Sequence, residues 1–415
     1  MKSLKIRKSA IPMAVSGTFV VLLLLSDVCY YLRITPSGLF PGIVKTAFYA
    51  LVLLCGIWTI IRKRIALDSA ILLFLCFTGV TLISTVRGVP TDIAVWRQLI
   101  HLTFFATSFV VSYAATEFEG ILHCQQFLKL PFWLFSVLYC FAALRNGISV
   151  QNAVYYLIVF LPVLSFFKSS SLRRIMSVFL VLLTLLSNKR TMLVAVVAYF
   201  MVCELLSNRR ITKEKFIWKS ILYTGGCIGL YFVFPIIIQA LDITVFKELS
   251  ISHILEDGGS NRFYIYGMLW AQQMRGNFTH WLIGDGYNAV LFSRVCRDGV
   301  LGAYVSAHND YLEVLYDYGI VGLTLYLAFL GLMLKRGLAM VRAERTYGYA
   351  FVGSVAMVLI ISLSSHLIIY LNYYAAFFLF WGMCLADHHK KEKIIQKYRS
   401  EAIGENICNY SGVQL

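Results

Sequence analysis

Charged and apolar residues meet abruptly in one stretch of the chain, Ser306-Ala307-His308-Asn309-Asp310-Tyr311-Leu312-Glu313-Val314-Leu315-Tyr316-Asp317-Tyr318-Gly319-Ile320-Val321-Gly322-Leu323. A histidine, an asparagine and three carboxylates come first, and a hydrophobic run over 318–335 follows directly. A long apolar run of this kind is typical of a membrane-spanning helix. The stretch therefore predicts a polar cluster at a membrane boundary, where surface chemistry takes place.

The composition of the whole chain agrees with a membrane location. Hydrophobic residues make up 59% and charged residues 14% of the sequence, and the mean hydropathy is +0.73. Soluble proteins carry nearer a quarter of charged residues. The sequence thus predicts an all-α integral membrane protein. Counting about twenty residues per span gives roughly twelve transmembrane helices, at 11–32, 40–61, 66–86, 99–115, 130–144, 154–167, 175–187, 191–206, 220–240, 318–335, 349–367 and 373–386.

Basic residues predict the orientation of these spans. Most of the 37 Lys and Arg residues fall in the segments that are cytoplasmic if both termini lie inside. The positive-inside rule favours that arrangement, and it explains the net charge of +16. No basic patch with interleaved aromatic residues indicates a nucleic-acid partner.

One connection is far longer than the others. We expect spans one to nine in residues 1–240, a large outer loop in 241–317, the last three spans in 318–387 and a cytoplasmic tail in 388–415. Connections of this length are uncommon and usually functional. The long loop is therefore where the sequence predicts the chemistry.

The loop contains an amphipathic helix and a glycine-rich turn. Phe263, Tyr266, Trp270 and Met274 recur at spacings of three and four directly after Arg262. Such a pattern predicts a helix with one aromatic face, and we expect it to lie along the membrane interface, where Trp and Tyr prefer to sit. A turn over 281–287 with the order Gly-Asp-Gly follows.

The motif H-N-D-Y-L-E-x-L-x-x-Y-G-I-x-G-L over 308–323, with an Arg, an amphipathic helix and a Gly-x-Gly turn before it, resembles the O-antigen polymerase and O-antigen ligase superfamily. These bacterial membrane enzymes move glycans off an undecaprenyl diphosphate carrier. The resemblance extends over roughly residues 180–325. It implies a GT-C-like fold and a metal-independent transfer that inverts the anomeric centre.

A second element of the resemblance lies upstream, in Ser187-Asn188-Lys189-Arg190-Thr191. Superfamily members carry a similar S-x-x-R-T or S-R-T element whose Arg is regarded as functional. Arg190 occupies the matching position, and Lys189 is a second cation beside it. The resemblance thus implies a role for Arg190 in binding and catalysis.

These residue types suit glycan transfer from a lipid diphosphate. His308 can orient or deprotonate the acceptor hydroxyl, since an unperturbed imidazole has a pKa of about 6.5. Arg190 and Arg262 can grip phosphate oxygens with paired hydrogen bonds, and Lys189 adds a point charge. Asn309 and Glu313 are candidate supporting residues. We expect no metal and no cofactor, because the loop has no evident carboxylate cage for a divalent ion and the chain has no P-loop.

Each candidate also has a structural interpretation. Lys189 and Arg190 could anchor lipid headgroups. His308 could serve the start of the helix entering span ten, because Asn309 and Asp310 are good N-cap residues. The carboxylates of the motif at positions 313 and 317 could form a solvated helix face or hold a nearby Arg. His366 was assigned a structural role, as a lone polar residue near a span end.

Two classes of function fit the chain. A lipid-linked glycan transporter or flippase should show paired halves or broken helices at the membrane midplane, and neither is evident, so the sequence favours a glycosyltransferase. The full motif favours a polymerase of O-antigen or capsule repeat units over a ligase that transfers the finished glycan to lipid A core. The expected partners are an undecaprenyl diphosphate-linked glycan, an acceptor glycan or lipid A core, membrane lipid and a chain-length regulator protein. The expected location is the bacterial inner membrane, with the active site on the periplasmic side.

Overall fold

The computed structural model describes residues 11, 13–18, 42–63, 67–88, 93–146, 154–187, 189–207, 218, 240, 262–292, 306–368 and 371–411. The regular elements of these residues are helices, in the order α2 (Gly42–Lys63), α3 (Ser69–Gly88), α4 (Ile93–Glu119), α5 (Ile121–Cys124), α6 (Gln126–Asn146), α7 (Val154–Ile158), the 3-10 helix η2 (Leu161–Phe166), α8 (Ser170–Leu186), α9 (Arg190–Ser207), α12 (Arg262–Arg275), α13 (Phe278–Ile283), α14 (Ala289–Phe292), α16 (Asp310–Arg342), α17 (Gly348–Ser364) and α18 (Leu371–Ser411).

The helical architecture agrees with the predicted all-α class. Within the described part of the chain, α3 and α16 have the length and apolar composition that a membrane crossing requires, and α17 is a shorter apolar helix. The expected spans over 11–32 and 220–240 fall mostly outside the described residues. The number of twelve spans stays a prediction.

The predicted span over 154–167 is not one helix. The chain forms the short helix α7 and then η2, which has a proline in its first two positions. That proline is Pro162, which has no backbone N–H and cannot continue the hydrogen-bond ladder of an α-helix from the preceding turn. The apolar composition of this segment was correctly noted, but the continuous helix was wrong.

The helix that leads into the tenth predicted span begins at Asp310 and bends at Gly319, whose φ of 65° and ψ of −168° are non-helical. The boundary between loop and span at residue 318 stays a prediction. The polar motif is therefore the first part of the same helix that continues into the apolar run. The bend separates a buried, carboxylate-rich segment from the membrane-length segment.

The helices form one bundle around an aromatic core. α4 packs on α18 and on α2, while α16 packs between α3 and α17, and α17 packs on α9. Phe378 of α18 lies at the centre, with its ring centroid 4.6 Å from that of Phe74 and 6.0 Å from that of Phe329. The ring centroid of Trp381 lies 5.3 Å from that of Phe378. These contacts hold α3, α16 and α18 together.

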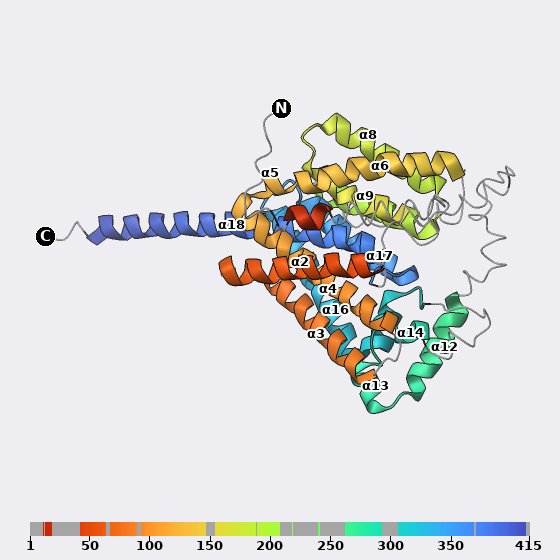
Figure 1. Cartoon of the computed structure of the whole chain (residues 1–415). Helices are drawn as coiled ribbons and strands as arrows, with labels where there is room; N and C mark the ends of the chain where they lie inside the picture. The colour runs from red at the N-terminus through yellow and green to blue at the C-terminus, as the bar shows by residue number, and fades with distance from the viewer. Residues whose placement is uncertain are drawn as a thin grey trace.

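The two ends of the bundle carry different groups. In Figure 1, α12, α13 and α14 lie beside the ends of α3 and α16, whereas the C-terminal part of α18 projects from the opposite side. At that opposite end, a carboxylate oxygen of Asp68 lies 3.0 Å from the guanidinium of Arg336, with which it forms an ion pair. The same oxygen lies 3.0 Å from Nε2 of His389. The loop elements thus gather at one end of the bundle, and the basic tail leaves from the other.

Candidate functional site

The motif begins with a helix cap. The side chain of Asn309 accepts hydrogen bonds from the N–H groups of Tyr311 and Leu312, both at 3.0 Å, so it is the N-cap of α16. Its amide nitrogen also donates to the carbonyl of Leu363 at 3.0 Å. Directly before the cap, His308 has a φ of 52°, a left-handed conformation that is uncommon outside glycine. The capping role therefore belongs to Asn309, and the imidazole of His308 is left for other contacts.

The three carboxylates of the motif do not form a solvated face. Asp310, Glu313 and Asp317 are at most 2% exposed. Each accepts hydrogen bonds from backbone N–H groups elsewhere in the chain: Asp310 from Leu367 at 3.0 Å, Glu313 from Ala307 at 2.8 Å, and Asp317 from Asn288 at 2.9 Å and Val290 at 3.1 Å. The prediction of an exposed face for positions 313 and 317 is wrong, because a spacing of four residues does not reveal the loops that cover the helix. Glu313 instead holds the segment that presents His308.

His308 lies in a group of nitrogen-rich side chains. Its ring centroid is 4.7 Å from that of His366, and its carbonyl accepts a hydrogen bond from the hydroxyl of Tyr266 at 3.1 Å. Burial, together with the positive charges of Arg262 and Lys189, lowers the pKa of His308 to about 4. The imidazole is therefore neutral near pH 7 and can accept a proton.

The predicted cations reach this group from two other helices. Arg262 is the first residue of α12, and Lys189 directly precedes α9. The hydroxyls of Thr191 and Ser364 lie 2.9 Å apart, which fixes the start of α9 against the end of α17. Arg190 is the first residue of α9, and its side chain lies outside the described part. The structure thus brings His308, Arg262 and Lys189 together with the backbone of Arg190.

The electrostatics of this end favour an anion. The N-termini of α9, α12 and α16 meet here, and a helix N-terminus carries about half a positive elementary charge. The Nε atom of Arg262 is buried without a hydrogen-bond partner among the described residues. The guanidinium of Arg262 and the ammonium of Lys189, placed at helix starts, are the donor types that bind phosphate oxygens.

His366 is a neighbour of His308 that lies outside the motif. It lies just after α17, is 5% exposed, and its Nδ1 lies 3.0 Å from the hydroxyl of Ser306. No local pattern connects position 366 to the motif. The rule that an ionisable residue near a membrane span is a functional candidate by default was the available signal.

The Gly-Asp-Gly turn serves the scaffold. Gly284 and Gly286 have φ values of 69° and 103°, and a Cβ at either one would collide with the backbone of Asp317 or Thr85. Only residues without a Cβ allow two chain segments to cross this closely. Arg87 donates a hydrogen bond to the carbonyl of Gly284, and Ser84 donates one to the carbonyl of Asp317 at 2.7 Å. The turn is therefore clamped between the end of α3 and the bend of α16.

The predicted amphipathic helix is α12, and its predicted aromatic face is largely exposed. Trp270 and Met274 are exposed, Tyr266 is half-buried, and the side chain of Phe263 lies outside the described part. Ile265 and Leu269 form the face that packs inward. The aromatic face is thus available to a lipid surface, and its place in the membrane interface stays a prediction.

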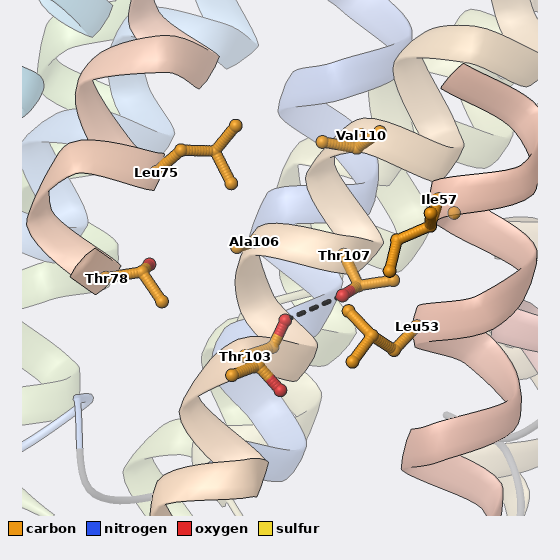
Figure 2. Close-up of a pocket in the computed structure, with 9 residues that line it drawn as sticks. Leu53, Ile57, Leu75, Thr78, Thr103, Ala106, Thr107 and Val110 are labelled. Atoms are coloured by element: carbon orange, nitrogen blue, oxygen red, sulfur yellow. Dashed lines mark hydrogen bonds between the residues drawn. The ribbon is translucent and has the colours of Figure 1, made fainter. Parts of the chain in front are cut away.

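An apolar pocket of about 170 Å³ lies elsewhere in the bundle, between α2, α3 and α4 (Figure 2). Leu53, Ile57, Leu75 and Val110 line it. The hydroxyl of Thr107 is turned to the carbonyl of Thr103 in its own helix, at 2.8 Å. With no acid, base or charged group in its lining, this pocket lacks the donors that a diphosphate needs.

A comparison with protein families decides the identity of the region that carries the site. Residues 175–327 match a family model described as O-antigen ligase. That segment is similar to O-antigen ligases. The predicted membership of the O-antigen polymerase and ligase superfamily is thereby confirmed, and with it the broad assignment of a membrane glycosyltransferase. No curated protein matches the chain.

The matched segment contains most of the candidate site. Lys189, Arg190, Arg262 and His308 all lie inside its limits, whereas His366 lies beyond its end. Among the described residues, no group of three or more His, Cys, Asp and Glu side chains could hold a metal ion.

Proposed function

We propose that this protein polymerises lipid-linked O-antigen or capsule repeat units, transferring a glycan from undecaprenyl diphosphate to a sugar hydroxyl of the acceptor. The observation that carries the proposal is the meeting of His308 with Arg262 and Lys189 at three helix N-termini. One group accepts a proton and the others attract a diphosphate. These are the two tasks that the transfer requires.

The step balances with these groups alone. The acceptor hydroxyl attacks the anomeric carbon of the donor sugar as the carbon–oxygen bond to the diphosphate breaks, and the electron pair of that bond leaves with the diphosphate. His308 orients that hydroxyl and takes its proton as the new carbon–oxygen bond forms. Arg262, Arg190 and Lys189 hold the leaving diphosphate and stabilise its growing charge. Attack opposite the leaving group inverts the anomeric centre, without a metal ion or a cofactor.

Donor binding prepares the base. The pKa of His308 is about 4, lowered by burial and by two cations. A bound diphosphate adds negative charge beside the same cations and raises the pKa of the imidazole toward neutrality. A base with a pKa nearer the working pH is more effective in general base catalysis. We therefore expect the acidic limb of the rate profile to lie higher for the donor complex than for the free enzyme.

The alternative acceptor is lipid A core, in which case the same site acts as a ligase. The full motif from His308 to Gly322 favours the polymerase. A transporter or flippase fits less well, because the paired cations and imidazoles gather at one end of the bundle. A polymerase would take a lipid-linked glycan, an acceptor glycan and membrane lipid as partners, together with a chain-length regulator protein.

The assay that tests the function uses purified protein, a lipid-linked donor and a chelator. Arg262→Ala should lower glycan transfer by roughly a hundredfold or more, because one donor to a developing oxyanion contributes on this order. Arg262→Lys should recover part of the loss, since it keeps the charge but not the paired geometry. Arg275, at the other end of α12, is the matched control, and Arg275→Ala should transfer normally. Full activity of Arg262→Ala contradicts the diphosphate assignment. Loss of wild-type turnover on chelation, restored by a divalent ion, contradicts the metal-free step.

The proposed location is the bacterial inner membrane, with α12 to α14 and the site in the periplasm and both termini in the cytoplasm. Reporter fusions at residue 275 should show an outside location, and fusions near residue 345 an inside one, because basic residues concentrate on the second side. Cys296, which lies outside the described residues, should react with an outside label. A cytoplasmic location of residue 275 contradicts the topology.

A further inference from the structure

The end of α17 and the residues directly after it pack against the start of α16. The carbonyl of Leu363 accepts from the amide of Asn309, and the N–H of Leu367 donates to the carboxylate of Asp310, both at 3.0 Å. The hydroxyl of Ser362 donates to the same carboxylate at 2.7 Å. Residues 362–367 therefore hold Asn309, the N-cap of α16, and Asp310, its first residue, in place.

His366 belongs to this segment and contacts the motif in two ways. Its ring faces that of His308 at a centroid distance of 4.7 Å with 33° between the planes. Its Nδ1 lies 3.0 Å from the hydroxyl of Ser306, two residues before His308. With 5% exposure, its ring is covered by protein, so it acts on its neighbour and does not reach a substrate directly.

We infer that His366 is a positioning residue, whose ring holds the imidazole of His308 in the orientation that faces the acceptor. The backbone of His308 is left-handed and sits directly before a helix cap, so its side chain is projected from a sharp turn. A flat ring packed against one face removes the freedom of rotation that such a position otherwise allows. This inference rests on the proposed function only for its kinetic consequence, because the ring contact exists without substrate.

The kinetic test compares three variants in the transfer assay. His366→Ala removes the ring and should lower kcat by roughly tenfold to a hundredfold, the cost of a reacting group displaced by about 1 Å. The KM for the donor should stay unchanged, since Arg262 and Lys189 remain. His366→Phe keeps a flat ring and should recover most of the rate. His366→Asn keeps a polar partner for Ser306 without a ring and should resemble His366→Ala.

A labelling measurement separates this inference from the proposed function. Diethyl pyrocarbonate transfers an ethoxycarbonyl group to a neutral imidazole nitrogen, and peptide mass spectrometry gives the rate at His308. That rate should rise severalfold in His366→Ala and stay near the wild-type rate in His366→Phe, whatever reaction the protein catalyses. If the wild type transfers no glycan but labelling follows this pattern, the proposed function fails and the positioning contact stands. A wild-type kcat in His366→Ala, or equal labelling rates in all variants, overturns the inference.

Discussion

His308→Ala should abolish glycan transfer at normal expression, with a loss of at least roughly a hundredfold to ten-thousandfold in kcat, the usual contribution of a positioned general base. The physical reason is that, in the described part of the site, His308 is the partly exposed imidazole beside the cations, and His366 is too buried to replace it. Binding of the donor should be retained, because the diphosphate contacts come from other helices. Binding and turnover are therefore expected to separate in this variant.

The control is a histidine at the other end of the molecule. His123 of α5 is partly exposed and remote from the motif, so His123→Ala should transfer at the wild-type rate. Glu313→Gln should cost less than His308→Ala, since an amide oxygen can still accept from the N–H of Ala307. Substantial turnover by His308→Ala in the purified assay removes the imidazole from the mechanism.

Gly319→Ala should be the most damaging change outside the chemistry. The residue has a φ of 65°, and an added Cβ would meet the backbone of Leu282 and Ile283. Left-handed backbone costs an alanine about 1 kcal/mol, and the clash with backbone atoms adds to it because these atoms cannot rotate away. The melting temperature in detergent should fall by roughly 5 °C or more, and transfer should be lost with it.

Gly331 supplies the matched control for this change. It lies in the same helix, has helical geometry, and an added Cβ would meet no atom within 4 Å. Gly331→Ala should leave the melting temperature unchanged or raise it slightly, because alanine is the better helix former. Equal melting temperatures for Gly319→Ala and Gly331→Ala would show that the crossing of the two turns does not support the fold.

The long-range patterns of the sequence predicted much of the architecture. Apolar run lengths predicted the bounds of α2, α3, α6, α9 and α17 closely, whereas α16 and α18 extend well beyond the predicted spans. The spacing of aromatic residues predicted α12. The break at Pro162 was missed because the hydropathy of a segment does not depend on whether it carries an N–H at each position. The bend at Gly319 was missed because a glycine in an apolar run is often an ordinary helix residue, as Gly331 is.

The candidate site was predicted in part. The charges of Arg262 and Lys189 act on His308, although the three residues are far apart in the sequence, and their roles stay a prediction. The motif was read as a set of reactive groups, whereas Asp310 and Asp317 tie backbone N–H groups of distant loops to α16. Hydrogen bonds of this kind depend on which loops pack against a helix. The local spacing of residues in a sequence does not indicate these tertiary contacts. The contact between the rings of His366 and His308 was not predicted for the same reason.

The clamp that α3 places on the loop has a consequence for biogenesis. Ser84, Thr85 and Arg87 bind partners that lie 233, 202 and 197 residues further along the chain. At a synthesis rate of about 5–20 residues per second, the end of α3 must wait roughly 10–50 s for them. Hydroxyl and guanidinium groups tolerate that interval, since water satisfies them in the meantime. The enzyme thus becomes competent only late, when the ribosome has delivered α16, and lesions at the end of α3 should appear as assembly defects rather than as slow catalysis.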